Sequence, residues 1–298
     1  MRLTGLLVIL LFAPPVYGAP GRFFYEGNGF LSIANENTKS RASVHYRLED
    51  GSYDRGALNR LNSVFGMPEK MGEDISLRLI SMLDYLEDKF AKGKTLALLS
   101  GYRSVDKNRR LRRAAKASQH IDGMAADVIF PGVPPKKVWE HLRTLDCCGA
   151  GYYGGKAVHV DSGRPRFWTG VSPRRPKGAD ENKYIYLSID KDIYFPGETI
   201  RLFLSGVSHF PFGIRPELRL MHKKRTILTL APDFKQRNHP TCQPIRQRAE
   251  TRFIYWKIPE KMKFPKGTLN FEMNFCDAER WVAMPKELIS KPFKIQTN

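Results

Sequence analysis

The sequence predicts two folded parts, an α+β domain over residues 22–170 and an all-β domain over residues 183–298. Three observations lead to this prediction. In the first part, apolar residues at helical spacing alternate with short apolar runs, which is typical of helices packed on a small mixed sheet. Residues 171–182 then have the Pro, Gly and charge content of a linker. Beyond them, short alternating segments separated by turns favour a β-sandwich.

The elements of the first part follow from its apolar spacing. Leu58, Leu61, Val64 and Phe65 recur at helical intervals, and a longer apolar stripe begins near Ile75. We expect helices over residues 55–65, 75–90 and 134–145, and strands over residues 43–48, 96–100, 125–130 and 158–160. Residues 105–117 are rich in Arg and Lys and predict a helix or a long basic loop. The Gly- and Tyr-rich residues 149–155 predict a turn.

The second part is predicted to consist of strands. Turns such as Phe195-Pro-Gly-Glu198 and Phe264-Pro-Lys-Gly267 separate segments that alternate between apolar and polar residues. The expected strands cover residues 184–189, 199–204, 218–221, 226–230, 253–257, 269–275 and 293–296.

The N-terminus predicts a signal peptide over residues 1–18. One basic residue, Arg2, precedes an apolar run that ends at Pro14-Pro15, and small residues follow at Gly18-Ala19. An uncleaved anchor is the alternative, which the length disfavours because the run is short for a membrane span. No later segment is apolar enough to cross a bilayer. We therefore expect a periplasmic or secreted protein without a transmembrane segment after cleavage.

Export and charge bear on the cysteines and the partners. In an oxidising compartment Cys242 and Cys276 could bridge, whereas the sequence leaves the state of the neighbours Cys147 and Cys148 open. The chain has 49 Lys and Arg against 30 Asp and Glu, a formal net charge of +19. Such a charge attracts polyanions, and for an exported protein we expect peptidoglycan or another anionic envelope polymer rather than nucleic acid.

A metal site is the main chemical signal. His120 and Asp127 lie seven residues apart, and His159 and Asp161 face the same side of an expected strand. His120, Asp127 and His159 supply two imidazoles and one carboxylate, a set that leaves one position of a zinc ion open, as in catalytic sites. Bound zinc lowers the pKa of its water to near 7 and polarises a carbonyl group. The sequence thus predicts Zn²⁺ as the cofactor.

The order of motifs around these residues resembles a known group of enzymes. The motifs are Ser100-Gly-Tyr-Arg-Ser104, Ser118-Gln-His-Ile-Asp-Gly-Met-Ala-Ala-Asp127, Gly149-Ala-Gly-Tyr-Tyr153, Val158-His-Val-Asp-Ser-Gly163 and Arg166-Phe-Trp168. Over residues 40–168 the chain is similar to the hedgehog-like zinc peptidases, the group of D-Ala-D-Ala and lysostaphin-type metallopeptidases. It looks closest to the periplasmic YcbK-like branch, which includes peptidoglycan endopeptidases.

The resemblance implies a hedgehog-like fold and assigns roles to individual residues. His120, Asp127 and His159 match the zinc ligands, Ser118 would support the ligand loop, and Arg103 matches an arginine expected to steady a carboxylate or carbonyl of the substrate. For Arg103 a structural ion pair is the alternative. The implied function is a zinc metallopeptidase that hydrolyses cross-links or stem peptides of peptidoglycan.

One position departs from the pattern. Many relatives carry a catalytic histidine two residues before the last zinc histidine, where this chain has Ala157. Asp161 is therefore the candidate general base or orienter of His159, with a structural turn carboxylate as the alternative. The departure also supports a second hypothesis, a catalytically inactive, zinc-containing cell-wall binding protein. A third hypothesis places the function in the sandwich domain.

Overall fold

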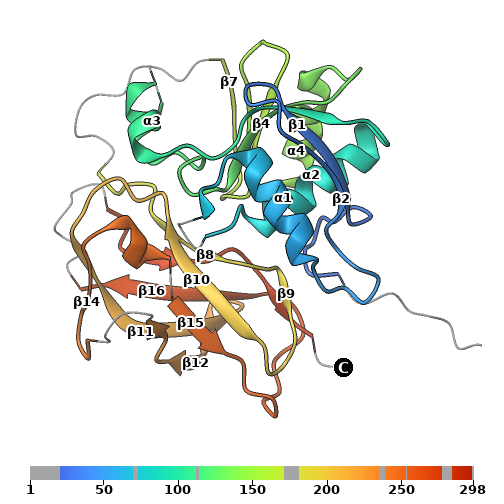
Figure 1. The fold of residues 1–298 in the computed structure, drawn as a ribbon. Helices are drawn as coiled ribbons and strands as arrows, with labels where there is room; N and C mark the ends of the chain where they lie inside the picture. The colour runs from blue at the N-terminus through green and yellow to red at the C-terminus, as the bar shows by residue number, and fades with distance from the viewer. Residues whose placement is uncertain are drawn as a thin grey trace, which may run out of the picture.

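The computed structural model describes residues 21–69, 73–111, 114–170, 181–234, 239–252, 254–276 and 284–296. The expected signal peptide and almost all of the expected linker lie outside these ranges. Two hydrophobic cores are present in the described chain, one formed by residues 31–160 and one by residues 185–295. Figure 1 shows the corresponding two bodies, the first carrying all the α-helices that are labelled and the second made mainly of strands. The mixed α+β class and the later β-rich region agree with the sequence.

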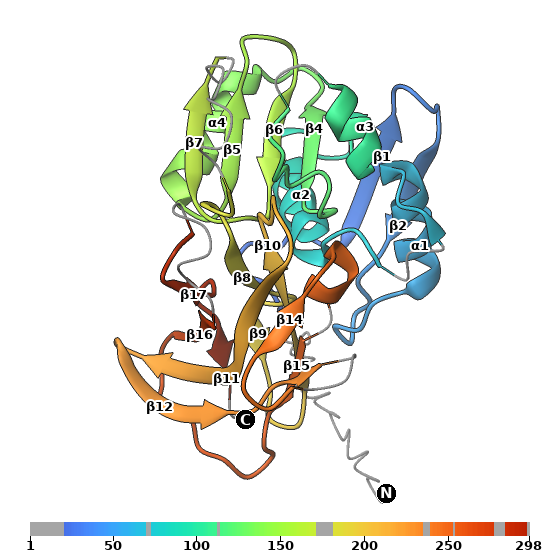
Figure 2. The same cartoon turned by 90° about the vertical axis from the view of Figure 1, so that its left-hand side faces the viewer.

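The first body is built on a mixed sheet. Within the described residues, seven strands form it in the order β2-β1-β3-β4-β6-β5-β7, with β1/β3 and β5/β7 parallel and the other pairs antiparallel. The strands are β1 (Phe30–Asn35), β2 (Arg41–His45), β3 (Leu96–Ser100), β4 (Ala125–Ile129), β5 (Gly149–Tyr152), β6 (Val158–Asp161) and β7 (Arg166–Thr169). Figure 2 shows β7, β5, β6 and β4 side by side.

The helices of this body begin where side chains satisfy their first backbone N–H groups. They are α1 (Arg55–Phe65), α2 (Leu77–Phe90), α3 (Val105–Arg110) and α4 (Pro135–Leu145). Asp54, Ser76 and Ser104 accept hydrogen bonds from the N–H groups of Ala57, Leu79 and Lys107. Because Ser76 is the cap, α2 begins two residues later than predicted. The basic stretch after Arg103 is a short helix, and α3 ends at Arg110.

One face of the sheet is covered by helices and the other carries polar residues. Val128, Val158, Val160 and Ala150 belong to the first core, in which α2 and α4 also bury their apolar faces. Since alternate residues of a strand point to opposite faces, Asp127, His159 and Asp161 lie on the other face. The pattern of the strands thus separates the core from the site.

The prediction of a turn over residues 149–155 was wrong in its first half, because Gly149–Tyr152 is strand β5 between β6 and β7. Glycine is typical of turns when neighbouring residues alone are considered. Here pairing on both edges imposes an extended backbone, and the glycines leave the strand without side chains on the polar face.

The second body contains two facing sheets. Among the described residues their strand orders are β13-β15-β10-β8 and β12-β11-β16-β17, and β14 pairs with β11. Their strands are β8 (Tyr186–Ile189), β10 (Thr199–Ser205), β11 (Phe212–His222), β12 (Arg225–Leu230), β13 (Asp233–Phe234), β14 (Gln243–Ile245), β15 (Ile254–Lys257), β16 (Leu269–Phe275) and β17 (Glu287–Ile289). The pair β9 (Ile193–Tyr194) and β18 (Lys294–Ile295) lies beside them. Trp256 of one sheet contacts Phe271 of the other, so the sheets share one core, as in the predicted sandwich.

All four cysteines lie in described segments and are paired as Cys147–Cys148 and Cys242–Cys276. The second bond is the one that the sequence suggested. The first joins the neighbours whose state the sequence left open. Disulfides are typical of proteins in oxidising compartments.

Candidate metal centre

The predicted ligands gather on the polar face of the first sheet. Asp127 of β4 lies directly opposite His159 of β6 in the antiparallel register. On β5, Gly151 pairs with His159 on one side and with Trp168 of β7 on the other. The result is a row of residues, Asp127, His159, Gly151 and Trp168, across four strands. The pairing of β4 with β6 thus places two of the three predicted ligands next to each other.

His120 reaches the same point from a loop. Residues 118–124 lead directly into β4, and Gly123 within them has φ +65°, a conformation that favours glycine. The Nδ1 atom of His120 lies 2.7 Å from the carbonyl oxygen of Gly101, to which it donates as N–H. Its Nε2 atom faces Asp127, 3.4 Å from Oδ2. The loop therefore adds the third predicted ligand to the two that strand pairing brings together.

The two ring nitrogens of His159 face two different carboxylates. Nδ1 lies 2.9 Å from Oδ1 of Asp127, and Nε2 lies 3.0 Å from Oδ2 of Asp161. One ligand atom each from His120, Asp127 and His159 lies within 4.8 Å of the other two. Both histidines are buried, with 2% and 6% of their surface exposed, and Asp127 is half-buried.

The donor set fits a zinc ion. Each histidine turns one nitrogen toward Asp127, while its other nitrogen is held by an acceptor, the Gly101 carbonyl for His120 and the Asp161 carboxylate for His159. Such outer partners fix the tautomer and orientation of metal-binding imidazoles. Two imidazoles and a carboxylate with converging donor atoms match the ligands that zinc takes in three-residue sites.

The ionisation of the cluster reflects this packing. Burial raises the pKa of Asp127, but the neighbouring histidines outweigh it and hold this pKa well below its usual range. Burial lowers the pKa of His120. Burial also lowers the pKa of His159, yet hydrogen bonds with Asp127 and Asp161 raise it to about 9. Asp127 is thus a carboxylate at neutral pH, the form that ligates a metal.

Arg103 lies against the ligand carboxylate. Its Nη2 donates to Oδ2 of Asp127 at 2.8 Å, and its Nε donates to Oγ of Ser100 at 2.9 Å. This is the ion pair that the sequence left as the alternative role for Arg103. About 15% of its side chain is exposed, so the guanidinium borders the site and is not sealed in the core.

Asp161 lies behind His159 and is fully buried. Besides His159, its carboxylate accepts from Nη1 and Nη2 of Arg166 at 3.0 and 2.7 Å and from the backbone N–H of Gly163 at 2.8 Å. Burial raises the pKa of Asp161, but Arg166 and His159 hold it well below its usual range. These contacts match the orienting and turn roles and leave the carboxylate without an open side toward solvent.

No role was predicted for Arg166, which reaches Asp161 across strand β5, where glycines face the site. Gly149 of β5 pairs with Asp161 on one side and Arg166 on the other, and a Cβ atom there would lie 2.1 Å from Oδ2 of Asp161. Gly151 plays the same part between His159 and Trp168, whose rings are 5.2 Å apart. In the sequence, Gly149 and Gly151 share a two-residue spacing with Arg166 and Trp168, but this spacing alone does not show that the two segments pair.

The aromatic residues of β5 and β7 and the tyrosine after β5 separate into two groups. Tyr153 is 48% exposed and its ring meets Trp168 edge to face, so both border the site. Tyr152 packs against the first core instead. His141 contacts Tyr85 and Phe90 and is not part of the cluster.

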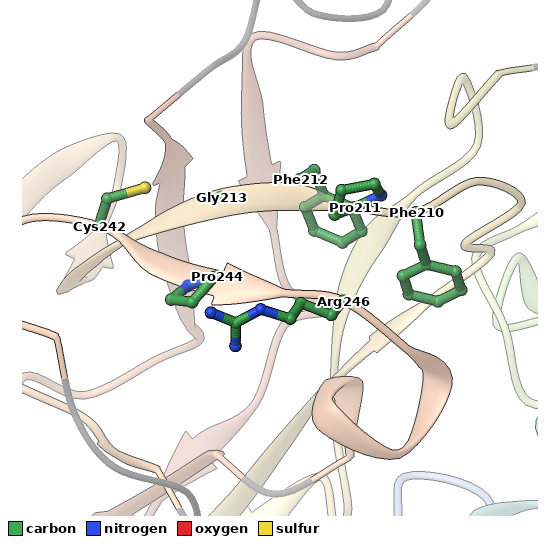
Figure 3. Close-up of a pocket in the computed structure, with 7 residues that line it drawn as sticks. All are labelled: Phe210, Pro211, Phe212, Gly213, Cys242, Pro244 and Arg246. Atoms are coloured by element: carbon green, nitrogen blue, oxygen red, sulfur yellow. The ribbon is translucent and has the colours of Figure 1, made fainter.

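An open hollow of about 500 Å³ lies in the second body and contains none of the predicted site residues. Figure 3 shows it between β11 and β14, lined by Phe210, Pro211, Phe212, Gly213, Cys242, Pro244 and Arg246. In the described residues, no helix has the length and apolar character needed to cross a bilayer.

The first body is similar to proteins of a known family. Residues 26–168 match the family described as peptidoglycan L,D-endopeptidase MepK. Proteins of that name from Escherichia coli strain K12, Escherichia coli O157:H7 and Shigella flexneri are each 30% identical to this chain over 139 residues. The alignment covers 44% of this chain and 76% of each relative. The family match includes all five predicted site residues and ends before the second body.

Proposed function

Because the chain belongs to the MepK family of hedgehog-like peptidases, we propose that it hydrolyses amide bonds in the peptides of peptidoglycan with the aid of zinc. The observation that carries the proposal is the convergence of His120, Asp127 and His159 on one point. The ring nitrogen of each histidine that faces away from this point is hydrogen-bonded to an acceptor. Peptide cross-links and stem peptides are the substrates that the family suggests.

The proposed division of labour follows the contacts. His120, Asp127 and His159 hold the metal, which when bound activates water and polarises the scissile carbonyl. Asp161 keeps Nε2 of His159 occupied, so that Nδ1 points at the metal position. Arg103 fixes Oδ2 of Asp127 and brings a positive charge to the rim, where it stabilises negative charge on the substrate. Trp168 packs on His159 and, with Tyr153, forms the apolar side of the rim.

We assign Asp161 to positioning rather than to proton transfer. Both of its oxygens already accept hydrogen bonds, and the residue is fully buried. A general base must reach the proton that it takes, directly or through one water. The bidentate contact with Arg166 and the contact with His159 leave Asp161 no such approach.

Export to the periplasm or beyond is part of the same proposal. The two disulfides and the expected signal peptide support an oxidising compartment. The net charge of +19 favours an anionic wall polymer as the surface on which the enzyme works.

The test combines metal content with digestion of cross-linked muropeptides. We expect one zinc ion per wild-type chain and cleavage of the muropeptides. In His159→Ala, zinc affinity and cleavage should both fall by more than the roughly 10–100-fold that loss of an outer partner of a ligand causes. His141→Ala is the matched control, since His141 is also packed among aromatic rings but lies outside the cluster. Stoichiometric zinc without cleavage would favour the cell-wall binding protein instead, and wild-type protein without zinc would refute the proposal.

A further inference from the structure

The loop that carries His120 is held from the second body. Residues 119–122 and Met124 are buried, although they belong to a connection rather than to a strand or helix. Figure 2 shows β8 and β10 of the second body reaching the end of the sheet at which β4 and β6 meet this loop. The loop therefore lies between the two bodies.

Asp122 is the main point of contact. It lies two residues after His120 and is 3% exposed. Its carboxylate is paired with the guanidinium groups of Arg248 and Arg252, and the backbone N–H of Gly206 lies 3.4 Å from its Oδ2. Arg252 also donates to the backbone oxygen of Asp122 at 2.8 Å. A buried carboxylate is unfavourable unless it is paired, so these contacts determine where the loop can lie.

The two arginines are themselves fixed. Arg248 is the first residue of the short 3-10 helix η2 (Arg248–Thr251), which follows β14, and Arg252 comes directly after this helix. Arg252 is 8% exposed, lies over the ring of Phe203 and pairs with Glu73, which precedes α2 in the first body. The network therefore joins both sides of the interface rather than forming a single flexible ion pair.

Two further contacts hold the same loop on either side of His120. The hydroxyl of Tyr186 in β8 donates to Oε1 of Gln119 at 3.1 Å. The hydroxyl of Ser205 in β10 lies 3.3 Å from the sulfur of Met124. Within the first body, His120 itself is held by the carbonyl of Gly101 and by the N–H of Arg103 on its backbone oxygen.

We propose that the second body is a positioning element of the metal centre, in which Arg248 and Arg252 hold Asp122 and thereby fix His120 at the metal. The inference rests on the proposed function. It assigns a role to a part of the chain that the family match does not reach, since that match ends at residue 168. We call the contacts of Arg248 and Arg252 with Asp122 the clamp. Loss of the clamp should loosen His120, lower the affinity for zinc and reduce turnover without changing the ligands themselves.

The test compares two ion pairs between the bodies. Arg248→Gln breaks the clamp at a side chain that is 22% exposed. Arg22→Gln is the matched control, because Arg22 pairs with Glu198 of the second body and is 21% exposed. Zinc affinity is measured by competition with a chelator, alongside turnover of muropeptides. We expect Arg248→Gln to weaken zinc binding about 10-fold and to lower kcat more than it changes KM. Arg22→Gln should stay within about twofold of wild type, and Arg248→Lys should recover part of the loss.

Tyr186→Phe provides a second variant that removes only a hydroxyl group, and it decides the matter if Arg248→Gln does not fold. It should weaken zinc binding in the same direction. The inference is overturned if folded Arg248→Gln or Tyr186→Phe binds zinc as wild type does, or if Arg22→Gln shows an equal loss. Failure of the proposed function gives a different result, because wild-type protein would then bind no zinc or bind it without cleavage.

Discussion

The Nε2 atom of His159 lies 3.0 Å from Oδ2 of Asp161, on the side of the ring opposite to the Nδ1 atom that faces Asp127. This arrangement gives the imidazole one orientation and directs Nδ1 toward the proposed metal. It also distinguishes two roles for Asp161, since an orienting carboxylate affects metal binding and a general base affects turnover alone.

Asp161→Asn is therefore expected to lower zinc affinity by roughly 10–100-fold, the usual effect of removing an outer partner of a ligating histidine. The amide keeps the shape of the side chain but loses the charge that holds the Nε2 proton. Chelator competition measures the affinity. Arg166→Gln is the control, because it removes another partner of Asp161 and leaves the contact with His159 intact, so its effect should be smaller. Unchanged zinc affinity with lost turnover in Asp161→Asn would show that Asp161 acts on a proton.

The bare face of β5 gives a second prediction. A Cβ atom on Gly151 would lie 2.4 Å from Cε2 of Trp168, so Gly151→Ala must displace the indole that packs on His159. We expect turnover to fall by about 10- to 100-fold, as a displacement of about 1 Å near the reacting groups can cause. Gly155→Ala is the matched control, since a Cβ atom there meets nothing within 4 Å. Equal turnover in both variants would contradict a role for Trp168 in shaping the site.

Lys291 predicts a pH-dependent contribution to stability. Its Nζ donates to the carbonyl oxygen of Cys147 at 2.6 Å, and burial lowers the pKa of Lys291 to about 7, with Arg78 and Arg166 acting in the same direction against Asp192 and Asp161. Because this pKa is lower in the folded chain than in the unfolded one, the contribution is fully present above about pH 10 and is lost as the pH falls toward 7.

The stability difference between wild type and Lys291→Met should therefore shift in favour of wild type as the pH rises from 7 to 10. The slope should be at most about 1.4 kcal/mol per pH unit. Thermal unfolding of both proteins over this range measures it. A Tm difference that stays constant or moves the other way would contradict the depressed pKa.

The disulfides should contribute unequally. Cys242 and Cys276 are separated by 34 positions. In the chain-entropy description, a bond across such a loop raises the free energy of the unfolded chain by about 4 kcal/mol. Cys147 and Cys148 are adjacent and enclose almost no chain. We expect the double variant Cys242→Ala, Cys276→Ala to lower Tm more than Cys147→Ala, Cys148→Ala. The reverse order in calorimetry would show that loop closure is not the main term.

The features that were predictable from sequence are those set by neighbouring residues. The helix over residues 55–65 follows from Leu58, Leu61 and Val64, and the structure has it at those bounds. The three ligand candidates were recognisable from residue type and order. By contrast, Gly149–Tyr152 is extended because β6 and β7 pair with it, which residues 149–152 alone do not encode.

The residues that support the site depended on contacts far along the chain. Asp122 and Arg248 are 126 positions apart, and no role was predicted for either residue. Arg166 reaches Asp161 because β5 lies between β6 and β7 and has a glycine, Gly149, between the two residues. Long-range pairs of this kind carry no local signal, so they became visible only in the folded chain.

We propose above all that one zinc ion is held by His120 Nε2, the Asp127 carboxylate and His159 Nδ1. Crystals grown with zinc and measured on both sides of the zinc absorption edge test it most directly. We expect one anomalous peak at roughly 2.0–2.2 Å from these three groups, with His159 Nε2 still hydrogen-bonded to Asp161. A peak at Nε2 of His159, or no peak between the three residues, would contradict it.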